Sequence, residues 1–298
     1  MATRRRRPAG LPYERRLRQL DDIYASAQET LAARVEAALR SGDLYDQRRW
    51  RSQLAAAVAV LDQLDAQVLP QARLLVAEAY RNGSERALAQ IRGLRVELPE
   101  IPGAFTGVSA DAVEQLERAI VDRLDVAHRT IGRQVADVYR REQLAAAMRA
   151  TLGATGSPRA AAADLAARLR QDRLVAELVR DGGVGFIDRS GRRWQLDSYA
   201  RMATRTVTRE AAVQGSMARM VSHGIALARV STHASACDVC KPMESRLISL
   251  DGAVATYEGE AVFSVGRVPP FHPNCAHSLL PFVPAIDELK RQMAAGRS

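Results

Sequence analysis

A long apolar stripe limits the folds open to this chain more than any other feature of its sequence. Between residues 111 and 150, apolar side chains recur at steps of three and four, the spacing of one helix face. The stripe consists of Val113, Leu116, Ile120, Leu124, Ala127, Ile131, Val135 and Val138. A helix of about 40 residues spans about 60 Å, which is more than a small compact domain can enclose. The stripe therefore calls for helical neighbours or a partner protein.

Similar patterns predict helices on the N-terminal side of this stripe. Residues 13–40 carry apolar side chains at helical spacing, and Asp43 can cap a second helix that runs toward Asn82-Gly83, a stop signal. Pro70 should kink or split that second helix, and a short helix should follow it to about Arg92. Prolines and glycines without periodicity predict a linker near 93–109, after which Ser109 caps the long helix.

The pattern changes after residue 182, where short strands become the better prediction. Residues 186–194 read as a hairpin with its turn at Ser190-Gly191, and a helix should follow over 198–223. Residues 226–232 and 246–250 read as two further strands. The predicted fold class is mainly α, with an elongated helical N-terminal part and a small, zinc-knuckle-like α+β C-terminal domain. The predicted domains are a basic flexible arm (1–18), a helical domain (19–180) and a C-terminal domain (184–298).

Charge and composition restrict the partners and the compartment. The net charge is +9, and the first 20 residues hold seven arginines and one glutamate. The run Arg4, Arg5, Arg6 and Arg7 indicates either an arm for double-stranded DNA, bound without sequence preference, or a solvated tail.

Three more arginines, Arg201, Arg205 and Arg209, share one helix face. They either meet phosphates or an acidic partner, or they form a solvated, ion-paired face. The longest apolar run, residues 54–61, predicts no membrane contact, and no secretory signal is expected, so the chain is cytoplasmic when made.

All three cysteines and three of the five histidines gather near the C-terminal end. The first group is Cys237-Asp238-Val239-Cys240, and the second is His272-Pro273-Asn274-Cys275-Ala276-His277. Two cysteines with two residues between them can place both thiolates on one metal ion, and Zn²⁺ takes four nitrogen or sulfur ligands. Cys237, Cys240, Cys275 and His277 would close such a site, with His272 and His233 as alternative ligands. Four closed ligands imply a structural rather than a catalytic zinc.

The same residues leave one enzymatic interpretation open. Zinc deaminases place His-x-Glu before Pro-Cys-x-x-Cys, an order that this chain does not follow. A zinc-containing nuclease remains an alternative, because His272, Asn274 and His277 are residue types that nucleases use. Pro273 and the cysteine between these residues nevertheless suit a metal-ligand loop better. No glycine-rich phosphate loop or nucleophile elbow is present. No catalytic residue is predicted.

The C-terminal third resembles a known family. The segments Ser231-Thr232-His233, Cys237–Pro242, Leu247–Gly252 and Pro269–Leu279 are similar to the C-terminal region of phage minor capsid proteins, with a head morphogenesis domain of the Mu type. The residues from Arg193 to Ala200 and from Arg205 to Ala211 also look like that family, so the resemblance covers about residues 184–284. Mu-type domains usually end in His-Pro-Asn-Cys-x-Cys, whereas His277 stands last here. A related branch has histidine-containing sequence where Cys237 and Cys240 stand, which leaves His233, Cys237 and His272 open as ligands.

The resemblance implies a minor structural protein of a tailed-phage head, not an enzyme. Such a protein would act in head morphogenesis inside the capsid, at or near the portal, after assembly in the host cytoplasm. Its expected partners are the portal or coat protein and packaged double-stranded DNA. Two alternatives remain: a zinc-containing nuclease or toxin-like enzyme carried in the particle, and a basic DNA-binding module.

Overall fold

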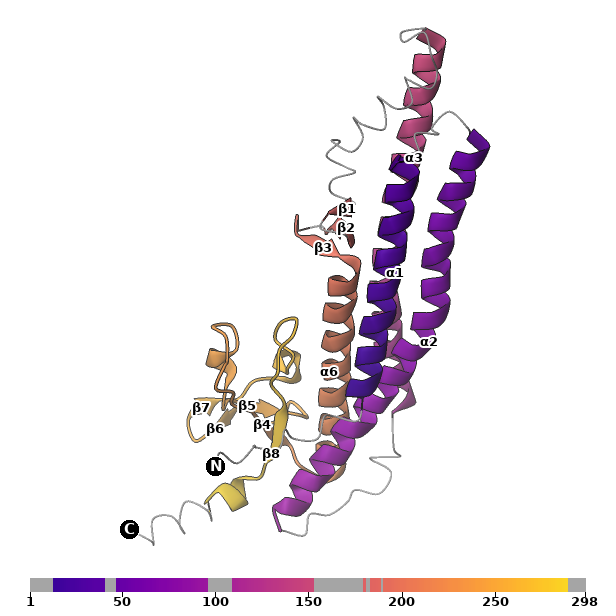
Figure 1. Cartoon of the computed structure of the whole chain (residues 1–298). Coiled ribbons are helices and arrows are strands. Elements are labelled where there is room, and N and C mark those ends of the chain that lie inside the picture. The colour runs from indigo at the N-terminus through magenta and orange to yellow at the C-terminus, as the bar shows by residue number, and fades with distance from the viewer. Residues whose placement is uncertain are drawn as a thin grey trace, which may run out of the picture. The chain divides into compact units, whose positions relative to one another are not determined.

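Long helices and a small region of short strands make up the structure, a computed structural model (Figure 1). It describes residues 13–40, 47–95, 109–152, 179–180, 183–188 and 190–288. The helices are α1 (Glu14–Arg40), α2 (Gln47–Gly93), α3 (Ala110–Leu152) and α6 (Leu196–Ser222). All the described strands lie between residues 179 and 282, which confirms a mainly α fold with a small α+β C-terminal part.

The two stripes that predicted α1 and α3 are buried. On α1, Leu20, Leu31 and Val35 are almost fully enclosed, and on α3 the whole stripe from Val113 to Val135 is buried. The Ser109 hydroxyl accepts a hydrogen bond from the backbone N–H of Ala112 (3.4 Å), so it caps α3 as expected. Apolar periodicity alone therefore located both helices.

The prediction for α2 was wrong at Asn82-Gly83, where the helix continues without a break to Gly93. A Cβ atom at Gly83 would overlap the carbonyl oxygen of Ala212 on α6, and one at Gly215 would overlap the carbonyl oxygen of Tyr80. The two glycines let the two helix backbones touch, and this packing outweighs the helix penalty of glycine, about 1 kcal/mol. Pro70 likewise lies inside α2, so the helix is not split there.

The hairpin is where the sequence placed it. Strand β2 (Gly183–Ile187) pairs with β3 (Arg193–Gln195), and β1 (Val179–Arg180) pairs with the other edge of β2.

The Asp188 carboxylate organises the turn between β2 and β3. It accepts hydrogen bonds from the Ser190 and Arg192 backbone N–H groups (both 2.9 Å) and from the Trp194 indole (2.8 Å). Together with a hydrogen bond from the Ser190 hydroxyl, these bonds lower the pKa of Asp188 to about 2. The Ser190 hydroxyl and the Trp194 indole contribute most.

A second small sheet carries the C-terminal region. Its strand order is β5-β4-β8, all antiparallel, with β4 at Leu227–Val230, β5 at Leu247–Ser249 and β8 at Leu279–Phe282. Strands β6 (Thr256–Tyr257) and β7 (Glu260–Ala261) form a separate pair, and two short 3-10 helices, η1 (Lys241–Met243) and η2 (Val265–Arg267), lie in the connections. The helix and strands predicted after residue 196 are confirmed.

The chain packs as two compact units, and α2, α3 and α6 contribute residues to both. One unit contains residues 73–120 and 202–298 together with the N-terminal residues to 15, and the other contains residues 16–72 and 121–201. The sequential domain boundaries proposed from the sequence stay predictions. The arginines Arg4 to Arg7 and most of the expected linker (96–108) lie outside the described residues.

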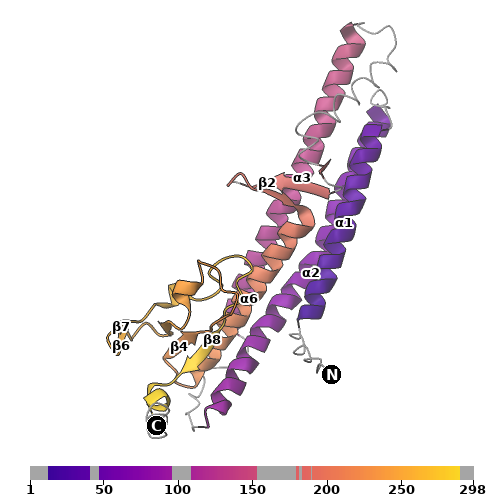
Figure 2. The same cartoon turned by 60° about the vertical axis from the view of Figure 1, so that its left-hand side comes forward.

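The unit that contains residues 16–72 consists of packed helices together with the hairpin. Here α1 runs beside the first part of α2 in both views (Figures 1 and 2), and the Arg16 guanidinium donates a hydrogen bond to the Gln71 side chain (2.6 Å). His128 on α3 is buried and pairs through Nδ1 with the Asp65 carboxylate on α2 (2.5 Å). The ring of Tyr24 lies against His128, with 5.6 Å between ring centroids.

The other unit places the small sheet against helices. Its core combines buried side chains of α2, α6, all three strands and the residues next to β4 and β5: Ala87, Ile91, Val213, Met220, Ile225, Ala228, Val230, Ile248, Leu250 and Leu279. Figure 2 shows the strands lying along the C-terminal part of α6. This core fixes the sheet, and the sheet in turn fixes the two loops that carry the cysteines.

Candidate metal centre

The register of the sheet explains why two distant loops meet. Arg229 of β4 lies opposite Leu247, at the start of β5, and Val230 lies opposite Leu279, at the start of β8. The loop that follows β4 and the loop that precedes β8 therefore lie at the same end of the sheet. Hydrogen bonds between Ser231 and Ser278 (2.9 and 3.0 Å) hold the bases of the two loops together. The first loop carries Cys237 and Cys240, and the second carries His272, Cys275 and His277.

The first loop is a tight turn around its two cysteines. The Cys237 carbonyl accepts hydrogen bonds from the backbone N–H groups of Cys240 (3.0 Å) and Lys241 (2.9 Å). The N–H groups of Cys240 and Val239 also face the Cys237 sulfur and lower the pKa of that thiol. Such a turn favours a thiolate at Cys237 and aims both sulfurs to one side.

The second loop repeats this turn with a histidine in first place. The Cys275 N–H donates to the His272 carbonyl (3.1 Å), and Asn274 has the left-handed backbone (φ 64°) that asparagine tolerates better than most residues. Arg209 on α6 donates through Nη1 to the carbonyl oxygens of Asn274 (2.9 Å) and Cys275. The loop is thus anchored to a helix that the core already fixes.

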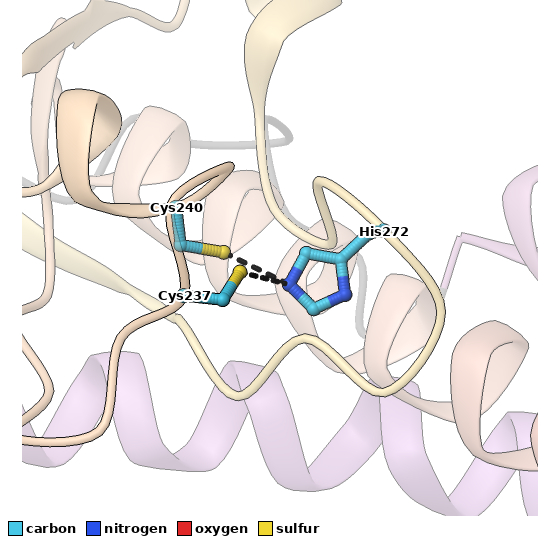
Figure 3. Close-up of side chains that lie close together, drawn as sticks. All are labelled: Cys237, Cys240 and His272. Atoms are coloured by element: carbon cyan, nitrogen blue, oxygen red, sulfur yellow. Dashed lines mark hydrogen bonds between the residues drawn. The ribbon is translucent and has the colours of Figure 1, made fainter.

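Five side chains converge where the loops meet, in two groups that share Cys240. We call Cys237, Cys240 and His272 the outer triad and Cys240, Cys275 and His277 the inner triad; within each, the ligand atoms lie within 4.8 Å of one another. Figure 3 shows the outer triad, in which His272 Nε2 points between the sulfurs of Cys240 (3.0 Å) and Cys237 (3.3 Å). In the inner triad, Cys275 Sγ lies 3.8 Å from Cys240 Sγ and 3.6 Å from His277 Nδ1.

The inner triad is the enclosed part of the site. Cys240 and Cys275 are each 1% exposed and His277 is 5% exposed, whereas Cys237 is exposed. Burial, with the neighbouring thiols of Cys275 and Cys237, raises the pKa of Cys240 to about 12. A buried thiolate at this position therefore needs a cation beside it.

A carboxylate lies directly behind the inner triad. Glu244 Oε1 accepts a hydrogen bond from the His277 ring through Nε2 (2.9 Å) and another from the His233 backbone N–H (2.6 Å). Both bonds lower the pKa of Glu244, that from His277 more strongly. The His233 ring packs edge-on against His277 (centroids 5.2 Å apart) and belongs to neither triad.

The donor set fits a divalent metal ion that prefers sulfur and nitrogen. Ligands at about 2.3 Å for sulfur and about 2.0–2.1 Å for nitrogen, arranged as a tetrahedron, lie about 3.5–3.8 Å apart. In the inner triad, the separations of Cys275 Sγ from Cys240 Sγ and from His277 Nδ1 have these values, whereas the separations of His272 Nε2 from the two sulfurs of the outer triad are shorter. The residues are therefore compatible with a metal centre, and the choice of Cys237, Cys240, Cys275 and His277 over sets with His272 or His233 stays a prediction.

Two contributors to this site, Arg209 and Glu244, were not assigned to it from the sequence. Arg209 was one of three arginines on a helix face, and its partner lies 65 residues away. Arg201, from the same face, pairs instead with Asp21 (3.4 Å) and Asp197 (3.8 Å). Glu244 follows the first loop but acts on His277, 33 residues further along the chain. Neither residue has a distinguishing local pattern.

The Cys/His motifs of the C-terminal region are the features that resembled phage minor capsid proteins, and a comparison with family models agrees. The model for phage minor capsid protein 2 matches residues 13–295, nearly the whole chain, so the chain belongs to that family. This family membership identifies a structural component of a phage virion. No curated protein and no solved structure matched the chain. None of the described helices is long and apolar enough to cross a membrane.

Proposed function

We propose that this protein is a low-copy structural component of a tailed-phage head, acting in head morphogenesis inside the capsid, and that it catalyses no reaction. The observation that carries the proposal is the enclosure of the inner triad. Its three ligand atoms face one another, and both thiols and the imidazole are buried. A catalytic metal site keeps one position open to substrate, whereas here Cys237 would supply the fourth ligand and close the site, which is the arrangement that supports a fold.

In this proposal the metal is zinc and its role is structural. Three cysteines and a histidine match the ligand types of structural zinc sites, and the two loops that carry them leave and enter neighbouring strands at one end of the small sheet. Zinc held by both loops would join them and so add its binding free energy to folding. The residues that would hold it are Cys237, Cys240, Cys275 and His277, with His272 as the alternative nitrogen ligand.

The proposed protein partner is the portal or the coat protein, and the proposed nucleic-acid partner is packaged DNA. Long helices with mixed charged faces offer extended surfaces to a protein partner, and four consecutive arginines near the N-terminus suit DNA phosphates. Sequence-independent phosphate contact is the kind of binding that packaged DNA allows, since the capsid meets every sequence of the genome.

Deleting the gene from its phage tests this function. We expect lysates of the mutant to contain aberrant heads or non-infectious particles, with infectivity restored by the wild-type chain supplied in trans. Cross-linking of intact wild-type particles should join lysines or acidic residues of this chain to the portal or coat protein. Normal, infectious heads in the deletion mutant would overturn the role in head morphogenesis.

A further inference from the structure

Glu244 belongs to neither triad, but its carboxylate is hydrogen-bonded to the histidine of the inner triad. Its Oε1 atom accepts from His277 Nε2 and from the His233 N–H, so the carboxylate links the base of the first loop to the histidine of the second. The side chain is 19% exposed on the face that lines an open pocket with Arg229, Lys241 and Arg246. The carboxylate therefore stays partly exposed to solvent while it accepts a hydrogen bond from the buried imidazole.

The bond to Glu244 determines which nitrogen of His277 faces the sulfurs. An ionised carboxylate can only accept hydrogen bonds, so in a neutral imidazole the proton sits on Nε2 and the lone pair on Nδ1. That lone pair points toward Cys275 Sγ, at a ligand-to-ligand separation of 3.6 Å. Metal-bound histidines in proteins usually donate their other N–H to a carboxylate or a carbonyl, which fixes the ring and makes it a better ligand.

His272 is held differently. Its Nδ1 lies 2.7 Å from the carbonyl oxygen of the adjacent Pro273, and its Nε2 lies 3.0 Å from Cys240 Sγ, which is a hydrogen-bond distance to sulfur. This anchor lies within its own loop and does not join the two loops. The contact of His272 with the sulfurs is also closer than the spacing of two ligands on one tetrahedral zinc ion.

From these contacts we infer that Glu244 is the positioning residue of the metal centre, and that it selects His277 rather than His272 as the nitrogen ligand. The inference rests on the proposed zinc site. Zinc with three thiolates and one neutral imidazole has a net charge of −1, so Glu244 acts by orienting the ring and raising its basicity and not by balancing charge. Loss of such a partner typically lowers metal affinity by about 10- to 100-fold.

Competition with a chromophoric chelator measures this effect on the full-length protein. We expect zinc affinity to fall by about 10- to 100-fold in Glu244→Ala and toward the lower end of that range in Glu244→Gln, which keeps an oxygen acceptor. Glu260→Gln is the matched control, since it removes a carboxylate that pairs with Arg246 (3.1 Å) in the same region and contacts neither triad. If Glu244→Ala does not fold, Glu244→Gln decides. An affinity equal to that of the wild type overturns the inference.

Cobalt substitution tests the ligand choice separately. Tetrahedral Co²⁺ in the wild type should show thiolate charge-transfer bands, which His277→Ala should alter strongly and His272→Ala should leave nearly unchanged. The reverse pattern would overturn the assignment of His277. A wild-type protein that binds neither zinc nor cobalt would instead refute the proposed metal site itself, and the virion role would still be judged on particles.

Discussion

The guanidinium of Arg209 donates a hydrogen bond to the carbonyl oxygen of Cys275 and thereby ties the central thiol of the inner triad to helix α6. A second bond from the same nitrogen reaches the carbonyl of Asn274 (2.9 Å). Replacing Arg209 with methionine should lower the free energy of unfolding by about 1.5 kcal/mol, the lower end for bonds to a charged group, because the site is only partly buried. Chemical denaturation monitored by fluorescence measures the change. Arg205→Met, one turn earlier on the same helix at an exposed position, should change it by less than about 1 kcal/mol.

If the proposed zinc is bound, removing it should loosen the C-terminal loops and leave the long helices intact. The helices have buried apolar faces of their own, whereas in the proposed site the metal ion would add the main link between the two loops. Hydrogen exchange after chelation, or in Cys275→Ser, should show lost protection over residues 231–246 and 268–279, with α1 and α3 unchanged. Uniform loss of protection across α1 and α3 would contradict this independence.

The close approach of α2 and α6 makes two glycines sensitive to substitution. Gly83→Ala and Gly215→Ala should each destabilise the protein by about 1–3 kcal/mol or more, since the added methyl would overlap backbone atoms that cannot move freely. Thermal unfolding measures the change. Gly93→Ala, at the end of the same α2 helix, has no atom near the new Cβ and should be neutral or slightly stabilising.

The hairpin turn should respond to acid through Asp188. Its pKa is lowered to about 2, so the carboxylate stabilises the fold fully above its unfolded value near 3.8 and progressively less as the pH falls toward 2. Carboxyl chemical shifts followed by NMR should give a midpoint well below that of an exposed aspartate. Asp188→Asn should remove the acid dependence of the Trp194 indole signal, and an unchanged dependence would assign it to another group.

The N-terminal arginines should contribute sequence-independent affinity for DNA. A deletion of residues 1–10 removes Arg4 to Arg7 and stops before α1, whose Arg16 is bonded to Gln71. If all four arginines meet phosphates, the slope of log affinity against log salt should fall by about 3.6, since each neutralised phosphate contributes about 0.9. An unchanged slope would show that this segment makes no DNA contact.

Local patterns predicted the helices and the gathering of the cysteines, because each depends on residues close in sequence. The stripe from Val113 to Val135 has the helical period, and both Cys237–Cys240 and His272–Cys275 form turns within four residues. The positions that sequence reasoning misjudged or missed depend on distant partners. Gly83 looked like a helix end until α6 was seen to pack on it, and the roles of Arg209 and Glu244 require the sheet register that brings the loops together.

The role of a minor head component is tested most directly by absolute quantification of proteins in purified virions. Isotope-labelled peptides from this chain, the portal and the coat protein would give copies per particle. We expect the chain to be present in every preparation of mature heads, in far fewer copies than the coat protein. Its absence from both virions and head-assembly intermediates would show that it is not a head component.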